Sequence, residues 1–349
     1  MPQSSIAKAG ILAIILVVIG FAAWEFYLRS KGIGIAYDDG PELWAAKREL
    51  ADVPMDQATI LIGSSRNKFD IDIATWEKLT GEKAIQLAVE GSSPLPMLDE
   101  LAADPKFKGK VLLDVTEGLF FALAPPAFSQ PNKMLKYYKE RTPAQRASFA
   151  VNTVVESQLA FLDKEFFSLN AMIKESWVKN RPGVFMLPCS FPLDFKRVNF
   201  DRQCIMTKKF ETDTSLRNYV KGIWYYYGTL DRMGPLKGPK LDSIFKTVQT
   251  AIAKIKGRGG KVVFVRSPSS GPYRAAEAAG YPRNAYWNRL LTSTGCQGIH
   301  FEDYPAIANF DCPEFSHLKQ SDAIIYTENI VKILHDKGWT FPKENSKSL

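Results

Sequence analysis

Short apolar runs that alternate with helical patterns at both ends of the chain constrain its fold more than any other feature. Near the start, the segments 59–65, 83–91 and 109–118 have the pattern of buried strands, each bounded by glycine or polar turn residues. Helical patterns over 72–81 and 96–105 separate them, and each is short enough to cross over between parallel strands. This part of the chain therefore predicts a β-α-β-α-β unit.

The same alternation returns near the end of the chain. Strands are expected at 261–267 and 298–304, and helices at about 241–256, 284–294 and 319–337. The two regions together supply about five parallel strands, which suffices for a flavodoxin-like, doubly wound sheet with helices on both faces. The predicted fold class is therefore α/β.

A long interruption separates these two regions. The segment 119–240 greatly exceeds the dozen or so residues that a crossover needs, so we expect a large, mostly helical insertion. Within it, 153–177 is amphipathic with the helical period and predicts a helix. The aromatic run 223–228 either packs against the sheet or shapes a substrate groove, and packing is the simpler account.

The N-terminus carries an apolar run that suits a membrane. Residues 9–28 contain one charged residue, Glu25, and a helix of about 20 residues matches a hydrocarbon layer of roughly 30 Å. Trp24, Phe26 and Tyr27 suit the lipid–water boundary, and a convincing small-x-small cleavage site is lacking. We therefore favour an uncleaved transmembrane anchor over a signal peptide.

These patterns divide the chain into a short N-terminus, an anchor, a juxtamembrane segment, a folded domain and a tail. We expect a cytoplasmic N-terminus at 1–8, the anchor at 9–28, the juxtamembrane segment at 29–57, the α/β domain at 58–338 and the tail at 339–349. Positive charges on the two sides of the anchor nearly balance, so they do not fix its orientation.

The four cysteines bear on the compartment. Cys189 and Cys204 bracket one loop and Cys296 and Cys312 another, which fits two local disulfides in an oxidising compartment. Three pairings are formally possible, and free buried thiols are the alternative. The chain has no Cys-x-x-Cys and only three histidines, so no metal site is expected. The net charge of +8 would attract anionic lipid headgroups or acidic polysaccharide, but the positive residues are scattered along the chain, and nucleic-acid binding has no specific support.

Polar turns follow four of the expected strands, at 63–65, 91–93, 116–118 and 266–271. The carboxyl ends of parallel strands meet at one edge of a sheet, where ligands gather. A serine at this edge becomes a nucleophile only where a base takes its proton and donors meet the developing oxyanion. The search for a site therefore becomes a search for a histidine.

His317 is the best candidate base. His300 lies in the short fifth strand and His335 in the last helix, where packed or solvated imidazoles are the simpler account. His317 lies in a loop that enters the last helix, with Glu314 three residues and Asp311 six residues before it as carboxylates that could orient the ring.

The order of these parts resembles the SGNH (GDSL-like) esterases and acyltransferases. In that family a nucleophilic serine ends the first strand within Gly-Asp-Ser, and an Asp-x-x-His motif precedes the last helix. Gly63-Ser64-Ser65 is similar to the first motif with Ser in place of Asp, a variant also found in membrane-anchored relatives that act on surface polymers such as teichoic acid. The resemblance spans residues 58–118 and 258–337.

This resemblance implies a role for each matching residue. Ser65 takes the nucleophile position, His317 that of the base and Glu314 that of the acid, although Glu is one methylene longer than the family's Asp. The backbone amides of Ser65 and Gly91 correspond to oxyanion-hole donors.

The third motif departs from the family. It usually supplies an Asn side chain to the oxyanion hole, whereas this chain has Thr116 and Glu117, of which only the Thr116 hydroxyl is a donor when Glu117 is ionised. Loss of one oxyanion donor typically costs about 10²- to 10³-fold in rate. Arg266 and the pair Ser269 and Ser270 are candidate substitutes.

Two further alternatives concern the turn after the first strand. Ser64 and Ser65 could simply cap a helix, since serine at such a turn often bonds an orphan amide. Arg66, Asn67 and Lys68 could bind an anionic group, although in a first helical turn they are more often solvated. Ser64 and Arg66, with Arg266, Ser269 and Ser270, form the expected substrate-binding set.

The resemblance implies a membrane-anchored serine O-acyltransferase or esterase that needs no cofactor. It would add or remove acyl groups on a periplasmic or cell-surface polysaccharide, and acetyl is the favoured group. The catalytic domain would lie on the periplasmic or extracytoplasmic side of a bacterial inner membrane. Membrane lipid, through the N-terminal helix, and a multi-pass membrane-bound O-acyltransferase are the expected partners. The alternative is a weakly active or inactive glycan-binding or scaffolding subunit of a membrane acylation complex.

Overall fold

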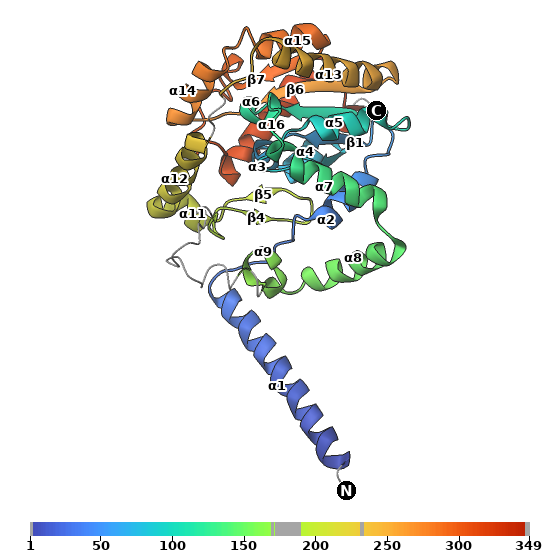
Figure 1. The fold of residues 1–349 in the computed structure, drawn as a ribbon, viewed down its shortest axis with the longest axis vertical. Coiled ribbons are helices and arrows are strands. Elements are labelled where there is room, and N and C mark those ends of the chain that lie inside the picture. Colours follow the sequence, from blue (N-terminus) through green and yellow to red (C-terminus); the bar gives the residue numbers. More distant parts are fainter. Residues whose placement is uncertain (1–2, 169–170, 172–189, 231–233, 346–349) are drawn as a thin grey trace. The chain divides into compact units, whose positions relative to one another are not determined.

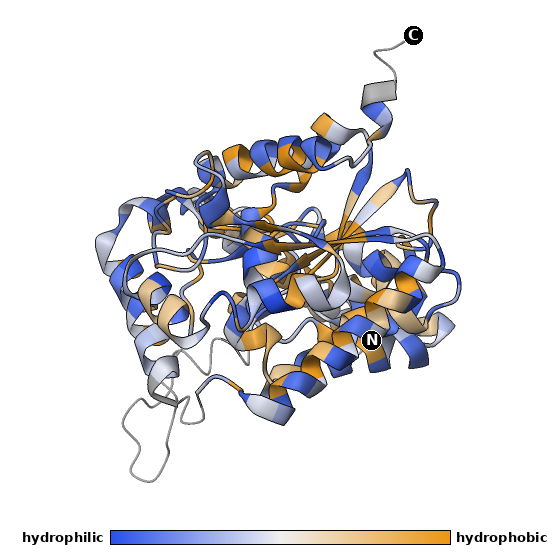
Figure 2. Cartoon of the chain, turned by 90° about the horizontal axis from the view of Figure 1, so that it is seen from above, coloured by the Kyte–Doolittle hydropathy of each residue, from blue (hydrophilic) through white to orange (hydrophobic). Residues whose placement is uncertain are grey.

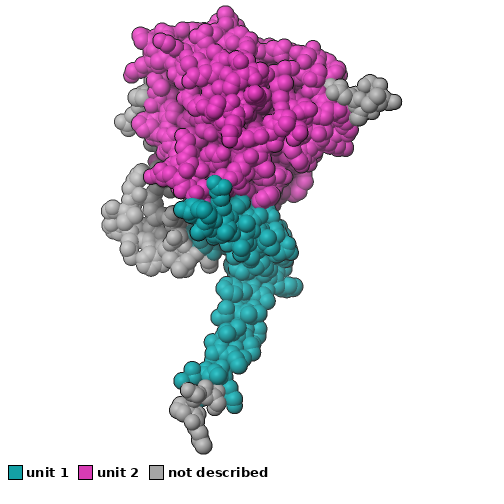
Figure 3. All heavy atoms as spheres, turned by 90° about the vertical axis from the view of Figure 1, so that its right-hand side faces the viewer, with its two compact units in different colours: residues 1–38, 142–188 teal, residues 39–141, 189–349 magenta. Residues whose placement is uncertain are grey.

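The computed structural model describes residues 3–168, 171, 190–230 and 234–345. Backbone contacts divide the chain into two compact units, which Figure 3 colours separately. The larger unit comprises residues 39–141 and 189–349, and the smaller one comprises residues 1–38 and 142–188.

The larger unit is built on a sheet of five parallel strands in the order β2-β1-β3-β6-β7 (Figure 1). This is a doubly wound order, so the α/β prediction is confirmed. The strands are β1 (Ala58–Ile62), β2 (Lys83–Gln86), β3 (Lys110–Asp114), β6 (Lys261–Arg266) and β7 (Gln297–His300).

Both faces of this sheet are covered. Successive side chains of a strand point to opposite faces, and in β1 Ile60 and Ile62 join one apolar cluster while Leu61 joins the other. Figure 2 shows the strands as a hydrophobic centre between more polar helices. Burial on both faces explains why the strands have nearly continuous apolar sequences.

A different set of helices covers each face of the sheet. The face that includes Ile60 is covered by α2 (Pro41–Glu49), α5 (Leu95–Ala103), α7 (Pro126–Glu140), α13 (Gly238–Gly257) and α15 (Trp287–Thr294). The other face is covered chiefly by α4 (Ile73–Thr80) and α16 (Gln320–Asp336). The remaining helical segments of this unit are α3 (Ser65–Asp70), α6 (Glu117–Phe120), α11 (Lys208–Thr212), α12 (Thr214–Leu230), α14 (Gly271–Gly280), η2 (Phe301–Asp303) and α17 (Pro342–Asn345).

The apolar core extends beyond the expected domain limits at residues 58 and 338. Trp44 of α2 is fully buried, and its indole donates to the Leu87 carbonyl at 3.0 Å. Trp339 and Phe341 are also buried, and the Phe341 ring meets Trp76 edge to face at 6.0 Å. Residues first placed in flanking segments therefore belong to the core.

Between β3 and β6 the larger unit also contains a two-stranded antiparallel pair, β4 (Arg197–Val198) and β5 (Cys204–Ile205). This pair packs with α3, α11 and α12 around a third apolar cluster that includes Phe69, Phe195 and Phe210. The cluster matters because it lies beside the candidate site.

The smaller unit contains α1 (Gln3–Ser30), α8 (Pro143–Glu156), η1 (Ala160–Leu162) and α9 (Lys164–Phe167). Helix α1 is long and apolar enough to cross a membrane, judged by its length and composition. The expected helix at 153–177 is wrong in its described part, because α8 ends at Glu156 and a new helix begins after Asp163, which caps the Glu165 amide. Residues 169–170 and 172–177 of that prediction lie outside the described residues.

The disulfide prediction also needs correction. Cys204, Cys296 and Cys312 are all free thiols, and Cys189 lies outside the described residues. Cys296 immediately precedes β7, whereas Cys312 lies beyond the opposite end of that strand, where its amide donates to Ser270 Oγ at 3.1 Å. The intervening strand separates two residues that their spacing suggested were close.

Candidate active site

The serine turn follows β1 directly. Ser65 is the first residue of α3, and Ser64 at the N-cap makes no capping hydrogen bond through its side chain. Instead, the buried Ser64 hydroxyl lies 3.1 Å from Asp114 Oδ2 and 2.7 Å from Thr116 Oγ1. The Ser65 side chain is only partly buried. The two serines therefore differ: Ser64 is held within the turn, and Ser65 is open to a ligand.

The loop before α16 brings His317 to Ser65. His317 Nε2 lies 2.8 Å from Ser65 Oγ, although the two residues are 252 positions apart. The loop is held close to α3 by the Leu318 amide, which donates to Asp70 Oδ1 at 2.9 Å. The parallel sheet makes this approach possible, because it gathers the carboxyl ends of distant strands at one edge.

Glu314 orients the other side of the imidazole. Its Oε1 lies 3.0 Å from His317 Nδ1 and accepts the His317 backbone amide at 2.7 Å. Its Oε2 accepts a hydrogen bond from the Trp224 indole. The carboxylate is fully buried, and these donors replace the water that an exposed carboxylate would have. The extra methylene of Glu, relative to Asp, is accommodated within the loop.

Three aromatic side chains enclose the imidazole. The rings of Phe69, Phe195 and Trp224 have centroids 4.5, 5.8 and 6.0 Å from that of His317. Only 1% of the His317 surface is exposed, so the ring is fixed in orientation. Low local polarity strengthens the hydrogen bonds that link Glu314, His317 and Ser65.

The loop turns sharply between the acid and the base. Phe315 has φ +79°, a left-handed conformation that a bulky residue rarely adopts. Its carbonyl accepts the Ser270 amide at 2.9 Å, and its own amide donates to the Cys312 carbonyl at 2.9 Å. Such strain typically costs about 1–3 kcal/mol and persists only where the surroundings enforce it.

Gly91 lies in the turn that follows the second strand. It is exposed and has φ +59°, a conformation that favours glycine. The turn is aligned with the serine turn by the Val89 amide, which donates to the Gly63 carbonyl at 3.1 Å. Ionic contacts of Glu90 with Lys68 at 2.5 Å and Lys196 at 3.0 Å hold it in place.

The Thr116 hydroxyl is committed elsewhere. It donates to Asp114 Oδ2 at 3.0 Å and lies 2.7 Å from Ser64 Oγ. A hydroxyl has one proton to donate, so this arrangement counts against the expected donation to an oxyanion. Burial raises the pKa of Asp114 despite the nearby Arg66 charge and these hydrogen bonds.

Three of the expected substrate-binding residues, Arg66, Arg266 and Ser269, lie in an internal ion cluster. Arg66 is fully buried and pairs with Glu277 at 2.5 Å, and Arg266 pairs with Glu277 at 2.5 Å and Glu117 at 3.0 Å. Ser269 Oγ donates to Glu277 at 2.6 Å. The expectation of a solvated first helical turn is therefore wrong: Arg66, Asn67 and Lys68 are all buried.

Ser270 joins the turn after β6 to the histidine loop. Its hydroxyl lies 3.2 Å from the Cys312 carbonyl, and its amide binds Phe315. The contacts of Ser270 thus position the loop that carries His317, whereas Ser269 binds Arg266 and Glu277. The sequence placed these residues correctly at the edge of the sheet, but their partners are protein groups.

The other two histidines lie on β7 and α16. The His300 ring packs between Trp287 and Phe301, with centroids 5.3 and 5.2 Å away. Burial, together with the positive charges of Arg266 and Arg283, lowers the pKa of His300 to about 4. His335 is exposed in the last turn of α16. Both positions agree with the packed and solvated alternatives.

Trp224, Phe69, Phe195 and Asp114 were missed as site residues from the sequence. The aromatic run 223–228 was the only signal for Trp224, and its pattern did not show which ring would reach Glu314. Phe195 comes from the loop before β4, so only the folded chain brings it to His317.

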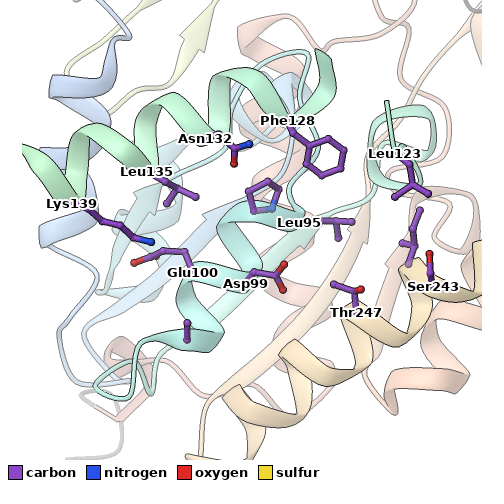
Figure 4. A pocket seen from close by; sticks show the side chains of 13 residues that line it. Leu95, Asp99, Glu100, Leu123, Phe128, Asn132, Leu135, Lys139, Ser243 and Thr247 are labelled. Atoms are coloured by element: carbon purple, nitrogen blue, oxygen red, sulfur yellow. The ribbon is translucent and has the colours of Figure 1, made fainter. Parts of the chain in front are cut away.

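A pocket elsewhere in the larger unit is separate from this site. It measures about 460 Å³ and lies between α5, α7 and α13, and its lining combines apolar side chains such as Leu95 and Phe128 with polar ones such as Asp99 and Lys139 (Figure 4). Neither Ser65 nor His317 lines it. Among the described residues, no group of three or more His, Cys, Asp or Glu side chains is arranged to hold a metal ion.

Comparison with known proteins gives no relative: no protein-family model matches the sequence, and no curated protein matches it. The functional interpretation therefore depends on the geometry of Ser65, His317 and Glu314.

The ion cluster behind the serine turn predicts a pH dependence of stability. Burial alone would raise the pKa of Glu277, but the charges of Arg266 and Arg66 outweigh it and lower the pKa from 4.5 to about 2. A lowered carboxyl pKa stabilises the fold above pH 4.5, and this contribution is lost as the pH falls toward 2. We expect Glu277→Gln to lower the free energy of unfolding by about 3–5 kcal/mol at pH 7, because two buried guanidinium groups lose their shared partner.

Urea unfolding of the full chain in detergent micelles at pH 7 and pH 3 measures this effect. The difference between wild type and Glu277→Gln should shrink at pH 3. Glu302→Gln is the matched control, because Glu302 pairs with Arg274 at the surface and its removal should cost at most about 1 kcal/mol. An equal loss of unfolding free energy in Glu277→Gln and Glu302→Gln would contradict the role of Glu277 as the shared partner of the two buried arginines. So would a loss that is the same at pH 7 and pH 3.

Proposed function

We propose that this protein is a membrane-anchored serine O-acyltransferase or esterase of the SGNH type. It adds or removes acyl groups, most simply acetyl, on a periplasmic or cell-surface polysaccharide. The observation that carries the proposal is the 2.8 Å contact between Ser65 Oγ and His317 Nε2, with Glu314 at 3.0 Å from the opposite ring nitrogen. The doubly wound order of the sheet and the apolar helix α1 support it.

The proposed reaction proceeds through an acyl-enzyme. His317 Nε2 takes the proton of Ser65 as Oγ attacks the acyl carbonyl, and Glu314 stabilises the imidazolium that forms. The tetrahedral intermediate collapses, and His317 returns the proton to the departing alcohol. A second hydroxyl then gives up its proton to His317 and attacks the acyl-serine, and His317 returns that proton to Ser65 Oγ as the bond between Ser65 and the acyl group breaks. A sugar hydroxyl as acceptor gives transfer, and water gives hydrolysis.

Backbone amides are the proposed oxyanion donors. The Ser65 amide is at the first position of α3, where a helix provides no internal acceptor for it. The Gly91 amide is the second donor, on a turn aligned with the serine turn through Val89 and Gly63. A third donor has to come from another group, since the Thr116 hydroxyl is committed to Asp114.

The proposed setting is the extracytoplasmic side of a bacterial inner membrane. Anchorage by α1 keeps the site beside membrane-linked acyl donors, which suits transfer more than release of free acid. A multi-pass membrane-bound O-acyltransferase is the proposed source of acyl groups, and no soluble cofactor is required for this chemistry.

A second candidate function is a weakly active or inactive glycan-binding or scaffolding subunit. The commitment of the Thr116 hydroxyl to Asp114 and Ser64 favours it, because loss of one oxyanion donor typically costs about 10²- to 10³-fold in rate. The two functions differ in one chemical property, the nucleophilicity of Ser65.

Covalent labelling with a fluorophosphonate distinguishes them. We expect the full chain in detergent micelles to form one adduct on Ser65, located by peptide mass spectrometry, because His317 is placed to activate that hydroxyl. His317→Ala should slow labelling at least about 10³-fold, since the base and the nucleophile act as a unit.

Ser64→Ala is the matched control. Ser64 is adjacent in sequence but turned toward Asp114, so its replacement should leave the adduct on Ser65. Labelling of Ser64 in place of Ser65, or labelling that is unchanged in His317→Ala, would exclude the proposed mechanism. Absence of an adduct in the wild-type chain would favour the binding function.

Trp224 is proposed as a positioning residue that acts through Glu314. Trp224→Phe keeps an aromatic ring but removes the indole donor, and hydrogen bonds to charged groups contribute about 1.5–3 kcal/mol. We expect p-nitrophenyl acetate hydrolysis to fall about 10- to 100-fold in kcat, with little change in KM. Tyr225→Phe, on the exposed side of the same helix, should leave both constants unchanged, and an equal fall in both variants would refute the role.

A further inference from the structure

Helix α8 exposes an apolar stripe. Its small and branched apolar residues recur at spacings of three and four, which places them on one side of a helix. Val151 and Val154 are 64% and 66% exposed, and none of the residues of α8 is buried. On the opposite side, Phe149, Thr153 and Glu156 are partly covered. The exposed stripe consists of Ala144, Ala147, Val151, Val154 and Val155.

The segment after α8 is bound to the end of α1. The Glu25 carboxylate of α1 accepts the backbone amides of Ala160 at 3.0 Å and Phe161 at 3.1 Å. The Phe161 ring stacks on Phe21, with centroids 5.2 Å apart and planes 9° apart. Arg29 donates to the Gln158 carbonyl at 2.9 Å. Residues 158–161 therefore lie alongside residues 21–29 of the apolar helix.

This attachment fixes the depth of the segment relative to a bilayer that α1 spans. Phe21 lies within the apolar run, and Trp24 and Tyr27 are the aromatic residues expected at the lipid–water boundary. A ring stacked on Phe21 must then lie at that boundary or deeper. Ala160 is only four positions after Glu156, the last residue of α8, and this separation spans at most about 14 Å. The carboxyl end of α8 is thereby kept near the membrane surface.

We infer that α8 is an interfacial helix whose exposed apolar stripe contacts membrane lipid. The stripe from Ala144 to Val155 inserts at the boundary between headgroups and acyl chains, while the side with Thr153 and Glu156 faces away from the lipid. An amphipathic helix in the plane of the interface is stabilised in proportion to the apolar area that it buries. The anchor then has two parts, a spanning helix and a surface helix joined through Glu25 and Phe161. This inference rests on α1 as the anchor and is independent of the chemistry at Ser65.

Single cysteines on the two sides of α8 test the inference. Val151→Cys, Val154→Cys and Asn152→Cys are made in the full chain, and all three positions are exposed in the structure. Each protein is placed at one copy per nanodisc, in phosphatidylethanolamine and phosphatidylglycerol. Modification by a charged, membrane-impermeant maleimide is then followed at each cysteine by peptide mass spectrometry, which separates the new thiol from the native ones.

We expect Val151→Cys and Val154→Cys to react at least about tenfold more slowly than Asn152→Cys, since the reactive thiolate is disfavoured in lipid and the reagent cannot enter it. One copy per disc excludes protection by a second copy of the chain. Equal rates at the three positions would overturn the inference. So would protection of Asn152→Cys together with the other two, because that pattern would mean burial of the whole helix and not of its stripe.

Discussion

The candidate site depends on one buried carboxylate. Glu314 is fully buried, and it is satisfied by the His317 ring and amide on one oxygen and by the Trp224 indole on the other. An unpaired buried charge would be strongly destabilising, so these donors and the carboxylate require one another. The same interaction sets the direction of the imidazole and thereby its approach to Ser65. A separate group of charges is centred on Glu277. It links Arg66, the residue after Ser65, to Arg266 at the end of β6.

Strain and charge are concentrated at the edge of the sheet where the loops meet. Phe315 has a strained, left-handed backbone between the acid and the base. Arg66 and Lys68 are buried beside Ser65 and are compensated by carboxylates from other elements. Such costs are typical of sites that hold reacting groups in place, and the buried apolar strands below supply the rigid support.

The sequence predicted the five strands and the flanking helices α4, α5, α13, α15 and α16, because hydrophobic period and turn residues are local properties. It did not predict α2 and α7 as separate helices. Asp72 and Gly81, which cap the two ends of α4, show how closely such signals can define an element. Ser65, Glu314 and His317 were found because a known order of motifs linked residues that no local pattern connects. Trp224 and Phe195 could not be found in that way, because their contacts depend on how β4, β5 and α12 pack. The spacing of Cys296 and Cys312 did not show that β7 separates the two thiols. The helical pattern over 153–177 did not show that α8 ends at Glu156 and that the following segment binds Glu25.

The central claim is that Ser65 carries the acyl group between donor and acceptor. Rapid acid quench of the full chain with an activated acetyl ester, followed by peptide mass spectrometry, tests it most directly. The account predicts that one acetyl group is present on the peptide that contains Ser65, that it appears before steady state, and that hydroxylamine removes it. An acetyl group on another residue, or steady-state turnover without any acetylated serine, would contradict the account.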